Sequence, residues 1–357
     1  MTPKAEMRRL LAFFEANGAQ VVEADILQSA EVLLDLYGED IRARAYVTSD
    51  ALRGEQMLRP DFTVPVVQMH MEHGAEPARY TYAGEVFRRQ EEDINRPSEF
   101  MQVGYEVFER ENPAAADAEV FALFKEALAP LGLRAATGDM GILMAAVRGL
   151  STTERRKAAL LRHIWRPRRF RALLDRFGGK VEVPASRLAL LAATDAMALA
   201  GPVMGLRSEA EINARIEALK DDAVAAPISD GEAAILDDIL NLREKAPMVL
   251  ERLRDIAVDL PAIISAVEAM DARLTAMSAR GVDVDGLDFE GSYGRTTLEY
   301  YDGFVFGFYA EARPDLPAVA SGGRYDALTS VLGQGRSIPA VGGVIRPELV
   351  HALGDQS

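Results

Sequence analysis

The four histidines are the first residues whose side chains could do chemistry. His70 and His73 stand three residues apart and would share one face of a helix, which suits two nitrogen ligands of a metal ion. A zinc site needs about three or four nitrogen or sulfur ligands. The sequence contains no cysteine, and no motif places further ligands beside this pair. We therefore predict that the protein holds no metal.

Three other catalytic patterns are missing from the sequence. It has no G-x-x-x-x-G-K phosphate loop, no G-x-G-x-x-G motif at the start of a helix, and no serine-nucleophile elbow. The lack of cysteine excludes thiol catalysis and disulfides, and it is compatible with a reducing cytoplasm. We predict no cofactor and a cytoplasmic protein.

A basic segment interrupts an acidic chain. The net charge of −15 argues against broad binding of nucleic acid. Residues 151–180, "STTERRKAALLRHIWRPRRFRALLDRFGGK", nevertheless concentrate arginines around Trp165, Phe170 and Phe177. This segment fits an amphipathic helical region with a solvated basic face, and it also fits a docking surface for an anionic partner. Contact with RNA is a third reading, although we do not expect tRNA to be a partner.

Length and hydropathy bound the architecture. A chain of 357 residues suggests about two structural units, and 49% hydrophobic residues can build an ordinary core. No window of about 18 uncharged apolar residues occurs, so we expect no membrane span. The amino terminus also lacks the pattern of a secretory signal.

The elements that must position a site follow from apolar spacing. Helical spacing opens the chain and returns near its middle, where Ile263, Val267, Met270, Leu274 and Met277 form one stripe. Alternation predicts strands, which we place at residues 42–50, 55–63, 78–89, 98–110, 286–293 and 303–311. We therefore expect an α+β core in two parts, residues 1–150 and 281–357, interrupted by a mainly helical insertion over 151–280.

Several separated motifs resemble one family. The stretches occur in this order: "LRPDFTVPVVQMH", "YAGEVFRRQEEDINRPSEFMQVGYEVFE", "LEYYDGFVFGFYAE", "SGGRYDALTSVLG" and "AVGGVI". Together they resemble the catalytic domain of class II histidyl-tRNA synthetases over roughly residues 1–150 and 281–350. The resemblance implies an antiparallel sheet flanked by helices, the class II synthetase fold.

The chain departs from this family where the chemistry is done. Thr296 stands where the family has an arginine, Leu349 replaces its closing arginine, and Gln90 replaces a glutamate. The sequence ends at Ser357, and we expect no anticodon-binding domain. Arginines stabilise the charge that builds up when a carboxylate attacks ATP. Amino-acid activation should therefore be lost, unless Arg295 or Arg346 substitutes.

The resemblance also implies a site for free histidine. In the family's positions, Asp61, Thr63 and Gln102 would hold the α-ammonium group, Glu106 would meet the imidazole, and Tyr301 would lie beside the ring. Arg88 is our candidate for the carboxylate. Tyr300 completes the tyrosine pair, and on a strand the two rings would point to opposite faces. Such hydrogen bonds to charged groups contribute about 1.5–3 kcal/mol each.

A synthetase-like body without these arginines resembles a second group, the regulatory subunits of ATP phosphoribosyltransferase. That resemblance implies a non-catalytic protein that forms a homodimer within a hetero-oligomer.

 The resemblance to regulatory subunits implies two partners: a short-form catalytic subunit of the transferase, and free L-histidine as the effector. The protein would activate the first step of histidine biosynthesis and mediate feedback inhibition by histidine. The alternative is a stand-alone amino-acid-activating enzyme of the same fold.

Overall fold

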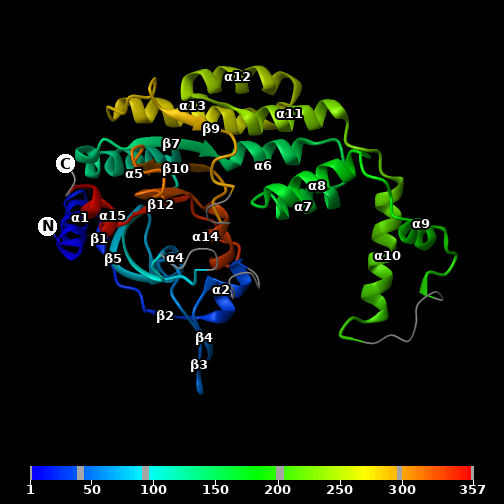
Figure 1. Ribbon diagram of the computed structural model, residues 1–357, viewed down its shortest axis with the longest axis horizontal. Helices are drawn as coiled ribbons and strands as arrows, with labels where there is room; N and C mark the ends of the chain where they lie inside the picture. The colour runs from blue at the N-terminus through cyan, green and yellow to red at the C-terminus, as the bar shows by residue number, and fades with distance from the viewer. Residues whose placement is uncertain (1, 38–43, 91–95, 198–204, 296–299, 355–357) are drawn as a thin grey trace.

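The computed structural model describes residues 2–37, 44–90, 96–197, 205–295 and 300–354. Within these ranges the chain forms one large sheet, one small sheet and layers of helices on both faces of the large sheet (Figure 1). No helix in the described ranges combines the length and apolarity needed to cross a membrane.

The large sheet has an antiparallel body. Across the described part of the sheet the order is β1 (Gln20–Val21), β5 (Ala78–Phe87), β6 (Glu99–Phe108), β12 (Ala340–Ile345), β11 (Ala320–Arg324), β10 (Phe304–Tyr309), β7 (Arg134–Asp139), β9 (Asp288–Glu290) and β8 (Arg243–Lys245). Each neighbouring pair from β5 to β7 is antiparallel, whereas β1 joins β5 and β9 joins β7 in parallel. The α+β class and the antiparallel sheet of the prediction are confirmed.

The β5–β6 hairpin carries most of the residues that matter below. Its register places Tyr80 opposite Glu106 and Gly84 opposite Gln102, as two alternating strands joined by a loop predict. Because alternate side chains of a strand face opposite ways, Gln102 and Glu106 share one face of β6, and Tyr105 lies on the other.

The Tyr105 face is covered by helices α1 (Pro3–Ala16), α5 (Pro113–Ala127) and α15 (Pro347–Gly354). Helix α1 begins after Thr2, whose hydroxyl accepts a hydrogen bond from the Ala5 N–H, and it buries Leu10 and Phe14. The Phe14 ring stacks on Tyr105 with centroids 5.1 Å apart. The predicted opening helix is therefore confirmed, and its apolar stripe forms part of the core.

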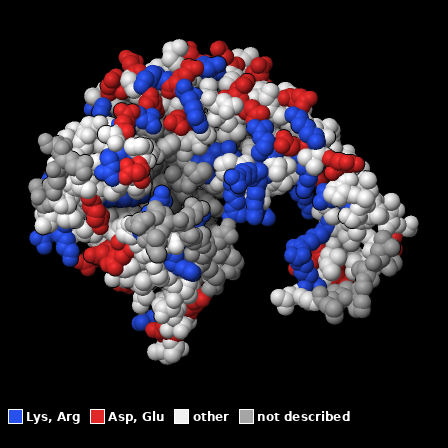
Figure 2. All heavy atoms as spheres, viewed as in Figure 1, with Lys and Arg blue, Asp and Glu red and all other residues white. Residues whose placement is uncertain are grey.

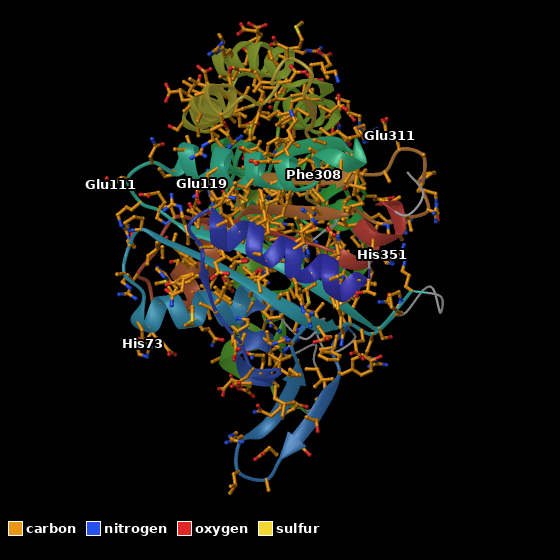
Figure 3. The ribbon with its side chains drawn as sticks, turned by 90° about the vertical axis from the view of Figure 1, so that its left-hand side faces the viewer. His73, Glu111, Glu119, Phe308, Glu311 and His351 are labelled. Atoms are coloured by element: carbon orange, nitrogen blue, oxygen red, sulfur yellow. The ribbon has the colours of Figure 1, made fainter. Side chains whose placement is uncertain are left out.

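The opposite face meets smaller elements. They are α2 (Ala30–Tyr37), α4 (Thr63–His73), α14 (Asp326–Leu332) and a three-stranded sheet of β2 (Leu27–Ser29), β4 (Gly54–Leu58) and β3 (Val47–Asp50). Figure 3 shows the β3–β4 hairpin projecting from one end of the molecule. Our predicted strand over 55–63 is wrong beyond Leu58. Pro60 cannot donate to a ladder, and Asp61 accepts a hydrogen bond from the Val64 N–H at the start of α4.

Helices make up most of the described part of residues 140–280. They are α6 (Met140–Gly149), α7 (Glu154–Arg162), α8 (Pro167–Phe177), α9 (Ala185–Ala192), α10 (Glu209–Val224), α11 (Asp230–Asn241), α12 (Ala246–Asp259) and α13 (Ile264–Ala279). The stripe along α13 is buried, and Gly281 follows the helix with φ +78°. Figure 1 shows α9 and α10 standing away from the sheet, whereas α11, α12 and α13 lie over α5 and α6.

The insertion is more closely tied to the core than its helical pattern indicates. Helix α13 packs on α5, and strand β8 extends the large sheet by pairing with β9. Strand β8 was not predicted, because three residues are too few to show alternation. The division of the chain at residues 150 and 281 stays a prediction.

Candidate functional site

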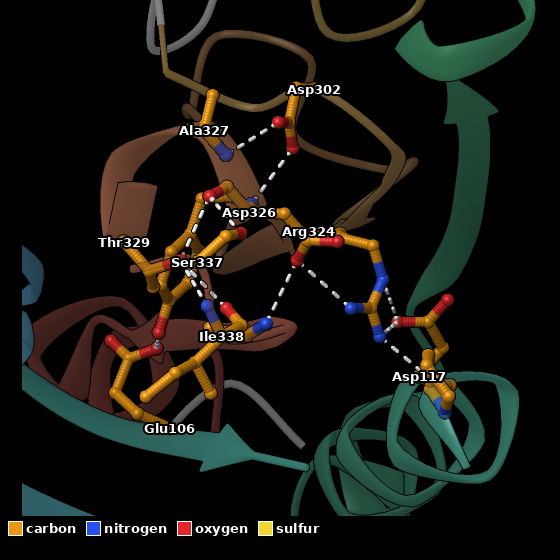
Figure 4. A network of polar contacts seen from close by, with 12 residues as sticks. Glu106, Asp117, Asp302, Arg324, Asp326, Ala327, Thr329, Ser337 and Ile338 are labelled. Atoms are coloured by element: carbon orange, nitrogen blue, oxygen red, sulfur yellow. Dashed lines mark hydrogen bonds and ion pairs between the residues drawn. The ribbon is translucent and has the colours of Figure 1, made fainter. Parts of the chain in front are cut away.

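A buried carboxylate lies at the centre of the predicted histidine site. Glu106 is fully buried and accepts hydrogen bonds from the hydroxyls of Tyr82 at 2.7 Å, Tyr325 at 2.6 Å and Thr63 at 3.1 Å. Burial raises the pKa of Glu106 to about 7, although the three hydroxyl donors oppose that rise. Figure 4 shows this carboxylate at one end of a chain of polar contacts that leads to α14.

Glycines in the neighbouring strands make room for this cluster. A Cβ atom at Gly104 would lie 2.1 Å from the Tyr82 ring, so the absence of a side chain lets that ring cross β6 and reach Glu106. A Cβ atom at Gly342, on the facing strand β12, would lie 1.5 Å from a Glu106 oxygen. The sequence motifs therefore contain glycine where the carboxylate must fit.

A small cavity of about 220 Å³ opens beside the cluster. The polar residues that line it include Arg88, Gln102, Tyr301 and Arg346. The Gln102 side chain is fully buried, and neither its amide nitrogen nor its amide oxygen has a hydrogen-bond partner within the described residues. Burying an amide without hydrogen-bond partners costs free energy. Such an amide is expected where a bound ligand supplies the missing partners.

Two guanidinium groups face this cavity without a carboxylate. Arg88 donates to the Pro60 carbonyl at 2.7 Å, and Arg346 donates to the Ala318 carbonyl. Neither forms an ion pair within the described ranges. Burial and the charge of Arg88 lower the pKa of Arg346 to about 10. Two cations close enough to affect each other favour an anionic group between them.

The predicted residues fall into two groups. Arg88, Gln102 and Tyr301 line the cavity, whereas Asp61, Thr63 and Glu106 are buried but do not line it. Tyr301 connects the groups: burial raises its pKa, and the charges of Glu106 and Asp61 raise it further. The structure thus brings three predicted residues to the cavity and holds three others in an adjacent buried cluster. The seventh, Tyr300, is buried and does not line the cavity.

The tyrosine pair differs from its prediction. Tyr300 and Tyr301 precede β10, which begins at Phe304, so they do not alternate across a strand. Their rings pack edge to face at 4.8 Å, and Tyr300 also meets the Tyr325 ring at 6.1 Å. Both are buried. The aromatic run resembled a strand, but Asp302 accepts from the N–H groups of residues 326 and 327 and turns the chain before β10.

Three site residues were not assigned from the sequence. Tyr82 and Tyr325 stood inside quoted motifs, but a tyrosine pattern alone does not reveal which hydroxyls converge on Glu106. Arg346 was considered only as a substitute for a catalytic arginine, and it lines the cavity. Arg295, the other possible substitute, does not line it; its Nε donates to the Ile164 carbonyl at 2.8 Å beneath α8.

The remaining predicted positions have these surroundings. Thr296 lies outside the described residues. Leu349 is half-buried on α15, and the neighbouring Glu348 carboxylate accepts a hydrogen bond from the Met101 N–H at 2.7 Å. His70 is buried and lies 3.1 Å from the Tyr80 hydroxyl, whereas His73 is exposed. The described residues contain no group of three or more potential metal ligands from histidine, cysteine, aspartate and glutamate.

Comparison with known proteins identifies the family. The family model described as histidyl-tRNA synthetase matches residues 3–350. Among curated proteins, this chain is similar to the ATP phosphoribosyltransferase regulatory subunits of Brucella ovis and Brucella abortus. The sequence identity is 30% in both cases, and each match covers 96% of this chain. The matches cover 95% and 94% of those proteins, respectively.

Solved structures show the same fold. An ATP phosphoribosyltransferase regulatory subunit/histidyl-tRNA synthetase from Bacillus halodurans superposes with a TM-score of 0.69 at 21% identity, over 98% of this chain and 78% of that one. Histidyl-tRNA synthetase from Nostoc gives 0.64 at 18% identity, over 99% of this chain and 71% of that one.

These findings define a protein with the class II histidyl-tRNA synthetase fold and a small polar cavity beside a buried carboxylate. The chain belongs to the histidyl-tRNA synthetase family, in the branch whose curated members are named ATP phosphoribosyltransferase regulatory subunit.

Proposed function

We propose that this chain is a non-catalytic subunit that senses histidine and regulates a short-form ATP phosphoribosyltransferase. It would bind and activate the catalytic subunit, which carries out the first step of histidine biosynthesis, and would transmit feedback inhibition by histidine. The observation that carries the proposal is the cavity lined by Arg88, Arg346 and Gln102, in a chain whose curated relatives are named regulatory subunits.

The cavity supplies what a free amino acid needs. Arg88 and Arg346 can hold the carboxylate, and the unpaired Gln102 amide oxygen can accept from the α-ammonium group. Tyr301 offers an aromatic wall for the imidazole. Hydrogen bonds to charged groups contribute about 1.5–3 kcal/mol each, so several of them approach the roughly 8 kcal/mol that micromolar affinity requires.

The buried cluster would act as the second half of the site. Glu106 is held by three hydroxyl donors, and exchanging one of them for an imidazole N–H would bring the carboxylate to the ligand. Asp61 and Thr63 would then approach the ammonium end. Histidine binding would thus rearrange the hydroxyl cluster as well as fill the cavity, which is a means of passing a signal to a partner.

Mixing experiments test this function. The chain should co-elute with a short-form catalytic subunit in size-exclusion chromatography as a hetero-oligomer built on a homodimer of this chain. It should also raise transferase activity and make that activity sensitive to histidine. Glu106→Ala should keep the complex but weaken the inhibition, because the ligand loses its acceptor. Separate elution with unchanged activity would contradict the proposal.

One observation favours a second function, amino-acid activation. Arg346 lies with Arg88 on the cavity, so two guanidinium groups remain where a phosphate of ATP could be bound. A histidine-dependent exchange of pyrophosphate into ATP decides between the two functions. We expect no exchange above a no-protein control, because Leu349 replaces the closing arginine of the synthetase motif and losing one such donor costs about 10²–10³ in rate.

A further inference from the structure

A second cavity lies apart from the histidine cavity. It has a volume of about 510 Å³ and is bounded by β7, by β9 and the residues after it, and by the start of α8. Its wall includes Arg295, Ser292, Glu290 and Pro167. Tyr293 and Tyr309 line both cavities and lie with their hydroxyls 2.8 Å apart, so this pair separates the two spaces.

Arg295 is buried here without an anion. The residue is only 5% exposed, and its guanidinium group lies 4.9 Å above the Phe170 ring. It forms no ion pair with any described residue, and its Nη2 atom has no hydrogen-bond partner among them. Burial and the charge of Arg171 lower the pKa of Arg295 to about 10. A buried guanidinium with an unused donor on a cavity wall is expected where an anion binds.

The start of α8 points to the same ligand chemistry. Pro167 is the first residue of this helix and lines the cavity, and the preceding Arg166 side chain makes no capping hydrogen bond. The N–H groups of Arg168 and Arg169 therefore have no intrahelical acceptor, and the helix dipole adds positive potential. Both side chains are exposed. Figure 2 shows basic side chains clustered over the α7–α8 pair at the edge of a hollow.

Arg295 is the cationic residue of the wall whose charge no described carboxylate compensates. Arg134 pairs with the Asp288 carboxylate at 2.9 Å, so its charge is compensated. Glu290 is acidic and works against an anion. We propose that Arg295 and the start of α8 form a phosphate-binding site distinct from the histidine cavity. A forked guanidinium and a helix amino terminus are both common partners of phosphate.

The only tryptophan of the chain allows a direct test. Trp165 lies two residues before Pro167, so its fluorescence should report binding. We would titrate the full chain with inorganic pyrophosphate, replacing chloride to keep the ionic strength constant. Arg295→Met should lower the affinity for pyrophosphate at least about tenfold, because a hydrogen bond to a charged group is lost.

Two matched variants sharpen the test. Glu290→Gln removes a negative charge from the wall and should leave the affinity unchanged or raise it. Arg254→Met removes an exposed arginine of α12 that pairs with Glu251 and Asp271, and it should change the affinity less than about twofold to threefold. Histidine binding by Arg295→Met should match the wild type, so this test is independent of the proposed function.

Pyrophosphate binding by Arg295→Met that equals the wild type would overturn the site, as would a wild-type response no larger than that to sodium chloride. If Arg295→Met does not fold, Arg295→Lys decides the question. It keeps the positive charge but loses the forked donor, so it should bind pyrophosphate more weakly than the wild type. Wild-type affinity in a folded Arg295→Lys would also contradict the proposal.

Discussion

Glu106 is a carboxylate held out of contact with water. Its carboxylate is surrounded by hydroxyl donors and is fully buried, and burial raises its pKa to about 7. A carboxyl group with a folded pKa above its unfolded value of about 4.5 adds stability at low pH. That contribution is complete below pH 4.5 and is lost as the pH rises through 7.

Glu106→Gln should therefore flatten the pH dependence of stability. Between pH 4.5 and pH 8 the wild type should lose roughly 3 kcal/mol relative to this variant, since one unit of pKa is worth about 1.4 kcal/mol. Urea unfolding at several pH values measures the difference. Glu99→Gln, at the exposed start of the same strand, is the control. A constant gap between wild type and Glu106→Gln over this range would show that Glu106 ionises as it does in the unfolded chain.

Arg346 is the residue that sequence reasoning undervalued, and it carries its own prediction. Arg346→Met should weaken histidine binding about 10- to 100-fold while the fold stays intact, because the ligand carboxylate loses one of two guanidinium partners. Calorimetric titration with histidine measures the change. Arg254→Met, which removes an exposed arginine on α12 paired with Glu251 and Asp271, should bind histidine like the wild type. Equal affinity of Arg346→Met and wild type would place the carboxylate elsewhere.

At the scale of elements, a buried network of ion pairs joins α5, α13, β7 and β11. Asp117 on α5 pairs with Arg324 on β11 at 2.7 Å and with Arg273 on α13 at 3.4 Å. Arg273 also pairs with Asp139 at the end of β7 at 2.6 Å. Figure 4 shows Arg324 reaching from its strand to Asp117. The network ties α13 to strands β7 and β11 of the large sheet. Strand β11 leads directly into Tyr325, whose hydroxyl donates to Glu106.

Removing Asp117 should damage this junction strongly. Asp117→Ala should lower the free energy of unfolding by about 3–5 kcal/mol, because Arg273 and Arg324 would keep buried charges with fewer partners. Asp237→Ala breaks a more exposed pair with Arg171 and should cost less than about 1 kcal/mol. Urea unfolding of both variants provides the comparison. Similar losses for the two would mean that the network is as solvated as a surface pair.

At the scale of the whole molecule, regulation of a partner requires that the complex have two states, one active and one inactive. Histidine can inhibit only by binding the inactive state of the complex more tightly than the active one. The coupling is reciprocal, so substrates of the catalytic subunit should change the histidine affinity by the factor with which histidine changes theirs, typically about 5–150.

Calorimetry on the mixed complex tests that reciprocity. The histidine affinity should fall by this factor when the complex is saturated with the substrates of the transferase, and it should stay constant for the isolated chain. Identical histidine affinities in the complex with and without substrates would remove the allosteric part of the proposed function, while leaving binding itself intact.

The sequence by itself determined the family, the α+β class and three of the residues that line the cavity. Alternation over 78–89 and 98–110 predicted the β5–β6 hairpin, and the synthetase-like motifs contain Arg88, Gln102 and Tyr301, which line the cavity. These features are local, because a strand needs only its own alternation and a motif needs only its own spacing.

Only the tertiary structure decided which side chains meet. Residues 59–63 turn into α4 and do not extend β4, because Pro60 cannot continue a ladder and Asp61 bonds to the helix start. Arg346 reaches the cavity, whereas Arg295 lies under α8, a difference that depends on contacts more than a hundred residues apart in sequence. Burial, which sets the pKa of Glu106 and leaves Gln102 unsatisfied, is likewise a property of packing that no short stretch of sequence contains.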